Sequence, residues 1–318
     1  MIDLSKTPTR GYRMASSSKS GNGSLREYVS KEDEPDGKYR VVKRIKTPVQ
    51  RIAVVETEKG ETLIYGDGYV MFGTTKDDEL WAESLVHIPM AAAANRGSVL
   101  LIGGGGGILA REALRYPDVK RITAVDADRI MMNLGKSLKS LVKFNQGALN
   151  NPKVTTIVKD GRAMVEGSRQ KWDVIVVDVP EPSEDVPQLR RLFSVNFYRL
   201  LKERLQPGGA IAVACTCLNA EMPEFSGSII KTIKAAGLYV LPYHMDVRKS
   251  YGQDWAYCLA SNRPLSSSGV KLRIKPRYLT ESKLKGMFVI PNRYRKKWKK
   301  GKIQTDRNHV LRDIHEEH

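Results

Sequence analysis

A run of five glycines, residues 103–107, is the part of this chain whose residue types most clearly indicate chemistry. It follows an apolar stretch at 99–102 and precedes a segment with helical periodicity at 108–116. Glycine lets a backbone pass close to a nucleotide at such a turn. A second apolar stretch ends in Asp126 and Asp128, about 20 residues further on, where a carboxylate can bind ribose hydroxyls. This order of strand, glycine turn, helix, strand and acid predicts a site for an adenosine-bearing ligand.

Two more acids follow predicted strands in the same way. Asp160 precedes Gly161 after one apolar run, and Asp178 ends the predicted strand at 173–177. In open α/β sheets, ligands bind at the carboxyl ends of the strands. We therefore expect Asp126, Asp160 and Asp178 to lie at one ligand site, with Asp126 placed for ribose hydroxyls. The alternative is that these acids are ordinary turn or capping residues.

The elements that must position these acids alternate between strand and helix. Strands are predicted at 99–102, 121–125, 154–158, 173–177, 210–217, 238–243 and 256–260. Helices are predicted at 77–94, 108–116, 128–143, 161–165, 192–205 and 226–236. Uniformly apolar strands that alternate with helices are typical of a parallel sheet covered on both faces. Before them, β-rich runs at 49–57, 62–65 and 69–73 are separated by glycine turns, which predicts a small antiparallel unit.

Composition limits the class of protein. With 318 residues the chain is long enough for one large or two small domains. No stretch approaches the ~18 uninterrupted apolar residues of a membrane span, and the N-terminus has no apolar signal-peptide core. The three cysteines lack metal-ligand spacing, so reduced thiols in a cytoplasmic protein without membrane contact are expected. His87 and His244 are isolated along the chain, so no metal site is expected.

Positive charge is concentrated near the C-terminus. The net charge is +18, and residues 271–302 contain thirteen Lys and Arg against one acid, Glu281, which accounts for +12 of it. Tyr294 and Trp298 are interleaved with these cations. The pattern suits a nucleic acid or another polyanion, bound through phosphate contacts and base stacking. A solvated, solubilising end is the alternative.

A series of motifs, in order along the chain, resembles the spermidine synthase (polyamine aminopropyltransferase) family. GDGYVM at 66–71 is similar to that family's DGxxQ, the Glu83 and His87-Ile88-Pro89 pattern to its E…HxP, and VLLIGGGGGILARE at 99–112 to its VLIIGGGDGGxxRE. VDAD at 125–128 is similar to its ExD, Asp160-Gly161 to its DG, and DVIVVDVPEP at 173–182 to its DVIIxDSxDP. LFSVNFYRLLKERLQPGGAIAV at 192–213 and WAYCLAS at 255–261 complete the match. The resemblance covers about residues 39–291.

This resemblance implies a fold and a reaction. The fold is α/β, a Rossmann-like class I methyltransferase fold whose doubly wound sheet is mostly parallel, with a small N-terminal antiparallel β-domain. We expect a disordered basic, Ser-rich segment at 1–38, the β-domain at 39–76, the S-adenosyl-binding transferase domain at 77–265 and a basic extension at 266–318. The implied reaction belongs to polyamine biosynthesis. It moves an aminopropyl group from decarboxylated S-adenosylmethionine to a small amine and releases methylthioadenosine, in a homodimer or homotetramer.

The resemblance also assigns roles to residues. Asp178 is the expected catalytic residue. The expected substrate-binding residues are Glu181, Glu83, Trp81 and Tyr251. The expected residues for the nucleoside co-substrate are Met71, Gly103, Gly105, Gly106, Asp126, Asp128, Asp160 and Gly161.

The chain departs from the family where the amine groups would bind. Gly106 stands in place of the family's loop Asp, which holds the aminopropyl amine, and Met71 stands in place of its Gln. An acid at 106 would repel the carboxylate of S-adenosylmethionine, and glycine removes that barrier. The missing charge then has to come from Glu83, Asp254 or another acid. The alternatives are a methyl- or aminocarboxypropyltransferase that uses S-adenosylmethionine, and a non-catalytic nucleoside-binding protein whose tail binds nucleic acid.

Overall fold

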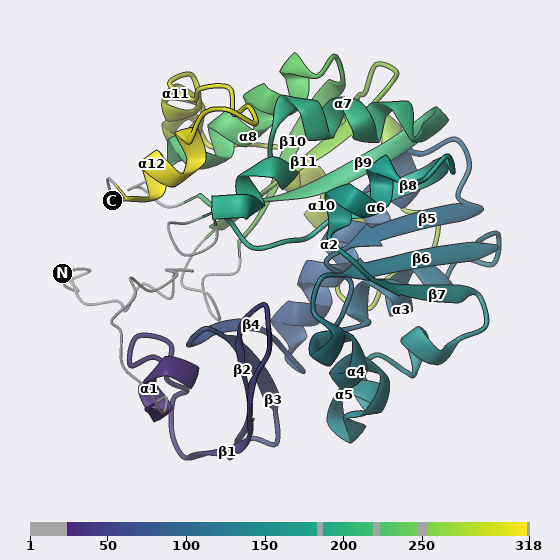
Figure 1. Cartoon of the computed structure of the whole chain (residues 1–318). Helices are drawn as coiled ribbons and strands as arrows, with labels where there is room; N and C mark the ends of the chain where they lie inside the picture. The colour runs from purple at the N-terminus through teal and green to yellow at the C-terminus, as the bar shows by residue number, and fades with distance from the viewer. Residues whose placement is uncertain (1–23, 183–186, 219–222, 247–253, 317–318) are drawn as a thin grey trace.

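Two sheets organise the computed structural model, which describes residues 24–182, 187–218, 223–246 and 254–316 (Figure 1). The smaller sheet has the order β1-β2-β3-β4, and each neighbouring pair is antiparallel. Its strands are β1 (Tyr39–Lys46), β2 (Arg51–Thr57), β3 (Thr62–Gly66) and β4 (Tyr69–Gly73). The predicted N-terminal antiparallel unit is therefore confirmed, with β1 added at its edge. Most of β1 is exposed and polar, so it has little of the apolar pattern that marks a strand.

The larger sheet has seven strands in the order β10-β11-β9-β8-β5-β6-β7. They are β5 (Ser98–Ile102), β6 (Arg121–Asp126), β7 (Val154–Val158), β8 (Trp172–Val177), β9 (Leu205–Cys217), β10 (Tyr239–Asp246) and β11 (Asp254–Ser261). The pairs from β9 to β7 are parallel, whereas β11 is antiparallel to both of its neighbours. Only seven residues, 247–253, separate β10 from β11. A parallel connection needs a crossover of a dozen or more residues, which explains the one reversed strand.

Helices cover both faces of this sheet, as the alternating pattern predicts. They are α2 (Lys76–Ala92), α3 (Ile108–Leu114), α4 (Arg129–Ser137), α5 (Lys139–Phe144), α6 (Gly161–Glu166), α7 (Val195–Glu203) and α8 (Pro223–Ala235), with short 3-10 turns η1 (Ala148–Asn150) and η2 (Pro187–Leu192). On β5, Val99 and Leu101 join the apolar core beneath α2 and α3, while Leu100 and Ile102 join the core beneath α7 and α8. The doubly wound, mostly parallel fold is thus confirmed. The single helix predicted over 128–143 is divided at Leu138, whose backbone is extended.

The segment before β1 corrects one expectation. Residues 1–23 lie outside the described part of the chain, but 24–38 are packed on the small sheet. A short helix, α1 (Leu25–Tyr28), leads to Val29, which is fully buried and bridges to Gly68. The Asp33 carboxylate accepts a hydrogen bond from the Val70 N–H at 2.8 Å. The prediction of disorder is therefore wrong for 24–38, because one apolar side chain and one carboxylate hold this polar segment in place.

The C-terminal segment also packs on the body of the protein. It contains η3 (Ser267–Gly269), α10 (Glu281–Met287), α11 (Asn292–Trp298) and α12 (Val310–Glu316). Leu284 and Met287 of α10 are buried in the core. Tyr294 is buried against the α8 side of the core, and the Trp298 Nε1–H donates to Ser226 Oγ at 2.8 Å. Both rings attach α11 to the protein, and the burial of Tyr294 leaves its ring no exposed face for stacking on a base. Among the described residues, no helix is both long and apolar enough to cross a membrane.

We expect Gly103→Ala to destabilise the protein far more than Gly147→Ala. Both glycines have positive φ, +91° and +66°, so alanine costs about 1–2 kcal/mol at either position. A Cβ at Gly103 would also overlap the carbonyl oxygen of Asp178, whereas a Cβ at Gly147 meets no atom within 4 Å. Urea unfolding should show an additional loss of at least about 2 kcal/mol for Gly103→Ala. Equal losses for the two variants would contradict this account.

Candidate active site

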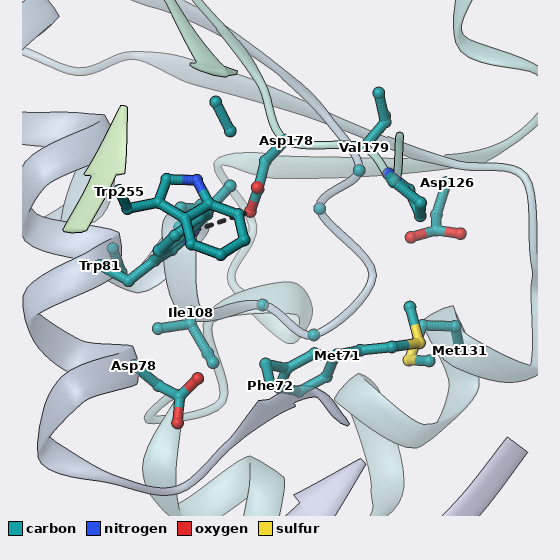
Figure 2. Close-up of a pocket in the computed structure, with 18 of the residues that line it drawn as sticks. Met71, Phe72, Asp78, Trp81, Ile108, Asp126, Met131, Asp178, Val179 and Trp255 are labelled. Atoms are coloured by element: carbon teal, nitrogen blue, oxygen red, sulfur yellow. Dashed lines mark hydrogen bonds between the residues drawn. The ribbon is translucent and has the colours of Figure 1, made fainter. Parts of the chain in front are cut away.

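One pocket lies where the carboxyl ends of β5, β6 and β8 meet (Figure 2). The glycine loop forms its floor, β4 and α2 close one side, and the segment after β8 closes another. The predicted site residues that line this pocket are Met71, Trp81, Gly103, Gly106, Asp126, Asp178 and Glu181. The sheet topology therefore brings together residues that are more than 100 positions apart in the sequence.

Backbone hydrogen bonds hold the glycine loop against β6. The N–H groups of Gly103 and Gly104 both donate to the Val125 carbonyl oxygen, at 2.9 and 3.2 Å. Gly107 has φ of +78° and turns the chain into α3. Glycine tolerates this backbone conformation without a steric penalty. The loop therefore presents backbone, and no side chain of its own, to a ligand in the pocket.

Asp126 lies at the opposite side of the pocket from α2 (Figure 2). Its carboxylate accepts hydrogen bonds from the N–H groups of Gly105 at 3.0 Å and Asp128 at 2.9 Å. Burial raises the pKa of Asp126 to about 6, although these two donors act to lower it. Met71 and Met131 lie next to it. A carboxylate beside two thioether side chains is suited to ribose hydroxyls and the apolar face of a nucleoside.

Asp178 follows the last residue of β8 and faces the middle of the pocket. The indole Nε1–H of Trp81 donates to its Oδ2 at 3.3 Å. Burial, together with the negative charges of Glu181 and Asp78, raises the pKa of Asp178 to about 7, although the Trp81 hydrogen bond acts to lower it. Trp81 is itself packed edge-on against Trp255, with ring centroids 4.6 Å apart. A positioned carboxylate with a pKa near 7 is suited to accept a proton at neutral pH.

Glu83 does not belong to this pocket, so its predicted amine-binding role is withdrawn. It is 1% exposed and lines a separate polar cavity with Glu79, Arg111 and Arg115. Its carboxylate accepts hydrogen bonds from the backbone N–H groups of residues 277–279. Three donors from a distant part of the chain occupy it, and sequence spacing gave no sign of them.

Four other predicted residues, all expected to bind the nucleoside, lie outside the pocket lining. Asp128 is buried, caps α4 through the Ile130 N–H and accepts from the Thr47 hydroxyl at 2.9 Å. Asp160 is exposed and caps α6, whose first residue is Gly161. Both acids therefore make the helix-capping contacts that we named as the alternative to ligand binding. Gly105 acts indirectly, because its N–H donates a hydrogen bond to the Asp126 carboxylate. Tyr251 lies outside the described residues.

Sequence analysis missed Phe72, Asp78 and Trp255, which all line the pocket. Phe72 explains the glycine at position 106. A Cβ on Gly106 would lie 2.7 Å from Phe72 Cζ, so the phenyl ring occupies the space of a side chain there. The only signal for Phe72 is its place directly after Met71 in a predicted strand. That signal does not show which way the ring points.

His87 is isolated in sequence but not in space. Its Nε2 lies 3.0 Å from Glu112 Oε2, its Nδ1 lies 3.0 Å from the Tyr116 hydroxyl, and Glu83 completes a buried group within 4.8 Å. Burial acts to raise the pKa of Glu112, but the hydrogen bond from His87 and the charge of Arg111 outweigh it and lower the pKa to about 2. These atoms already form a hydrogen-bonded ion network. Isolation along the chain therefore did not show that Glu83 and Glu112 lie beside His87 in space.

The described cysteines agree with the prediction of core thiols. Cys215 and Cys258 are buried and free. Burial raises the pKa of both thiols, which keeps them protonated and unreactive at neutral pH.

Comparisons with known proteins agree with one another. Residues 79–268 match the family model described as the spermine/spermidine synthase domain. The polyamine aminopropyltransferase of Oceanobacillus iheyensis is 33% identical over 232 residues, which is 73% of this chain and 44% of that protein. That of Mycobacterium tuberculosis is 36% identical over 211 residues, 65% of this chain and 38% of that protein. The matched part thus spans less than half the length of these relatives.

Solved structures share the fold. A spermidine synthase in complex with the transition state analogue AdoDATO has a TM-score of 0.71 and 22% identity, covering 82% of this chain and 87% of that chain. The spermidine synthase of Thermotoga maritima has a TM-score of 0.72 and 22% identity, covering 82% and 88%. At this identity the likeness confirms the Rossmann-like class I methyltransferase fold.

We expect Gly106→Ala to be destabilising only while Phe72 is present. The new Cβ forces the phenyl ring to move, and such overpacking costs about 1–3 kcal/mol. In a Phe72→Ala background the same substitution should cost almost nothing. A double-mutant cycle of urea unfolding measures this coupling. Additive effects would show that the ring does not fill the space beside residue 106.

Proposed function

The chain belongs to the spermine/spermidine synthase family, and we propose on this basis that it transfers an aminopropyl group from decarboxylated S-adenosylmethionine to a polyamine or a related amine. The observation that most strongly supports the proposal is the position of Asp178. A carboxylate with a pKa near 7 lies in the same pocket as a glycine loop and a ribose-binding acid, Asp126. The pocket therefore combines a nucleoside site with a proton acceptor.

The proposed reaction is a direct displacement. The neutral nitrogen of the acceptor amine attacks the methylene carbon next to the donor's sulfonium, and the carbon–sulfur bond breaks. The electron pair of that bond stays on sulfur, so neutral methylthioadenosine leaves. The proton lost by the acceptor nitrogen goes to Asp178, which the Trp81 Nε1–H orients. In this proposal Glu181, which also lines the pocket, binds the far ammonium of a polyamine.

A second candidate uses S-adenosylmethionine itself for methyl or aminocarboxypropyl transfer. The specific observation in its favour is Phe72, whose ring takes the place of a side chain at Gly106. The loop then has no carboxylate to repel that of S-adenosylmethionine. Incubation with each donor and putrescine or spermidine, followed by mass spectrometry, separates the two. Release of methylthioadenosine with an aminopropylated amine supports the first, and a methylated amine supports the second.

Two other expectations remain proposals supported by the family. One is assembly as a homodimer or homotetramer. The other is a cytoplasmic location, which fits the thiols of Cys215 and Cys258.

We expect Asp178→Asn to reduce kcat/KM about 10²- to 10⁴-fold while making the protein more stable above neutral pH. The folded-state pKa of about 7 exceeds the unfolded value of about 3.9. The folded state therefore holds more protons in this window, and stability falls as pH rises from about 4 to 7. The variant should lack the Asp178 part of that fall and keep the part from Asp126, because burial raises the pKa of Asp126 to about 6. In the wild type, kcat/KM should rise with pH through about 7 as the carboxylate forms.

Urea unfolding at several pH values and steady-state kinetics check these outcomes together. Asp118→Asn is the control, since Asp118 pairs with Arg96 at the surface and does not line the pocket. An active Asp178→Asn would exclude Asp178 as the proton acceptor.

We also propose that the basic segment 271–302 binds nucleic acid through phosphate contacts. All thirteen Lys and Arg residues of this segment are exposed. Since Tyr294 and Trp298 are used in packing, no base-stacking platform supports this binding. Binding should then depend on salt and hardly on sequence.

Replacement of Lys296, Lys297, Lys299 and Lys300 by Gln should weaken binding to duplex DNA or RNA. The slope of log K against log salt should fall by about 0.9 for each lost phosphate contact. A matched variant replaces four exposed lysines outside the segment, Lys38, Lys43, Lys59 and Lys120. Fluorescence anisotropy at several salt concentrations measures both. Equal weakening by the two variants would show that only net charge matters.

A further inference from the structure

The pocket has an acid on the α2 side that no family motif placed there. Asp78 lies in the first turn of α2, lines the pocket and is 5% exposed. Its Oδ2 accepts a hydrogen bond from the Thr75 hydroxyl at 2.5 Å, and its backbone N–H donates back to Thr75 Oγ1. These contacts fix the carboxylate at the pocket wall without neutralising its charge.

The neighbours of Asp78 define what this end of the pocket can bind. In Figure 2, Asp78 lies on the left with Ile108 and Phe72 beside it, and Asp126 lies on the far right. The loop side contributes no charge, because Phe72 occupies the space beside Gly106. A ligand whose ribose is held at Asp126 therefore meets an apolar wall first and a carboxylate at its other end.

The acids that line the pocket make its charge negative. Asp78, Asp178 and Glu181 all line the pocket, and the negative charges of Asp78 and Glu181 both act on Asp178. None of the described residues lining the pocket is a Lys or Arg. A cationic tail on a nucleoside is favoured in such surroundings, and a carboxylate is repelled.

We propose that Asp78 binds the terminal ammonium of the donor's aminopropyl chain and thereby selects decarboxylated S-adenosylmethionine over S-adenosylmethionine. The inference rests on the proposed function and deepens it. Asp78 supplies from α2 the negative charge that the glycine loop lacks. Asp178 and Glu181 remain for the acceptor amine, so the donor ammonium and the acceptor meet different carboxylates.

Asp78→Asn tests the proposal, because the amide keeps an oxygen that accepts from the Thr75 hydroxyl. Calorimetry compares three ligands: decarboxylated S-adenosylmethionine, S-adenosylmethionine, and methylthioadenosine, which lacks the ammonium. The variant should lose roughly tenfold or more in affinity for the decarboxylated donor. Its affinity for methylthioadenosine should be unchanged. The ratio of its affinity for the decarboxylated donor to its affinity for S-adenosylmethionine should become smaller.

Asp77→Asn is the matched control. It removes the same charge at the neighbouring position, and the Asp77 side chain does not line the pocket. It should leave all three affinities unchanged. Thermal unfolding of both variants reports any loss of the helix cap separately. If Asp78→Asn weakens methylthioadenosine equally, or raises only the KM of the acceptor amine, the assignment of Asp78 to the donor ammonium is overturned.

The proposed function can fail separately. If the wild type binds the decarboxylated donor and forms aminopropylated amine, yet Asp78→Asn keeps the wild-type affinity ratio of that donor to methylthioadenosine, only the role of Asp78 is refuted. If the wild type neither binds that donor nor forms the product, the proposed function and this inference are both refuted.

Discussion

The close approach of two backbones is the constraint on which the site depends. The Gly103 N–H donates to Val125, while the Asp178 N–H donates to Ile102 at 2.9 Å. A side chain at residue 103 would overlap the carbonyl oxygen of Asp178, so only glycine allows the loop and the end of β8 to meet. This contact places the glycine loop next to Asp178, the proposed proton acceptor. The strand order β8-β5-β6 then brings Asp126 to the other side of the same loop.

This arrangement buries several carboxylates close to one another, which has an electrostatic cost. Burial raises the pKa of both Asp126 and Asp178, and Asp78 and Glu181 add negative charge near Asp178. Folded proteins are stable by only about 5–15 kcal/mol, so several desolvated carboxylates are a substantial cost. A cationic ligand offsets that cost when it binds. The indole N–H of Trp81 is the direct stabilising contact that the protein itself provides to Asp178.

Charge is divided between two parts of the molecule. The pocket is acidic, whereas the excess of positive charge lies on the exposed side chains of 271–302. Contacts with the core hold the basic segment on the body of the protein that contains the pocket. Glu83 binds the backbone of 277–279, and Trp298 and Tyr294 attach α11 to the α8 side of the sheet. The basic segment is therefore held on the same body as the pocket, with its cations directed outward and its aromatic rings directed inward.

Local patterns in the sequence were sufficient to predict the strands of the larger sheet, the glycine turn and the acids at the strand ends. Periodicity, glycine runs and strand-terminal acids act through neighbours in the chain, so β5, β6, β8, Gly103, Asp126 and Asp178 are all recognisable before folding. The ends of parallel strands lie at one edge, which explains why Asp126 and Asp178 share a pocket.

Tertiary structure alone decided which other side chains line this pocket. Trp81 and Asp178 are 97 residues apart, and Phe72 fills the space beside Gly106 from another sheet. Asp78 and Glu83 are both acids of α2, yet one faces the pocket and the other binds 277–279. Packing against distant segments sets those directions, and a single sequence contains no local signal for them.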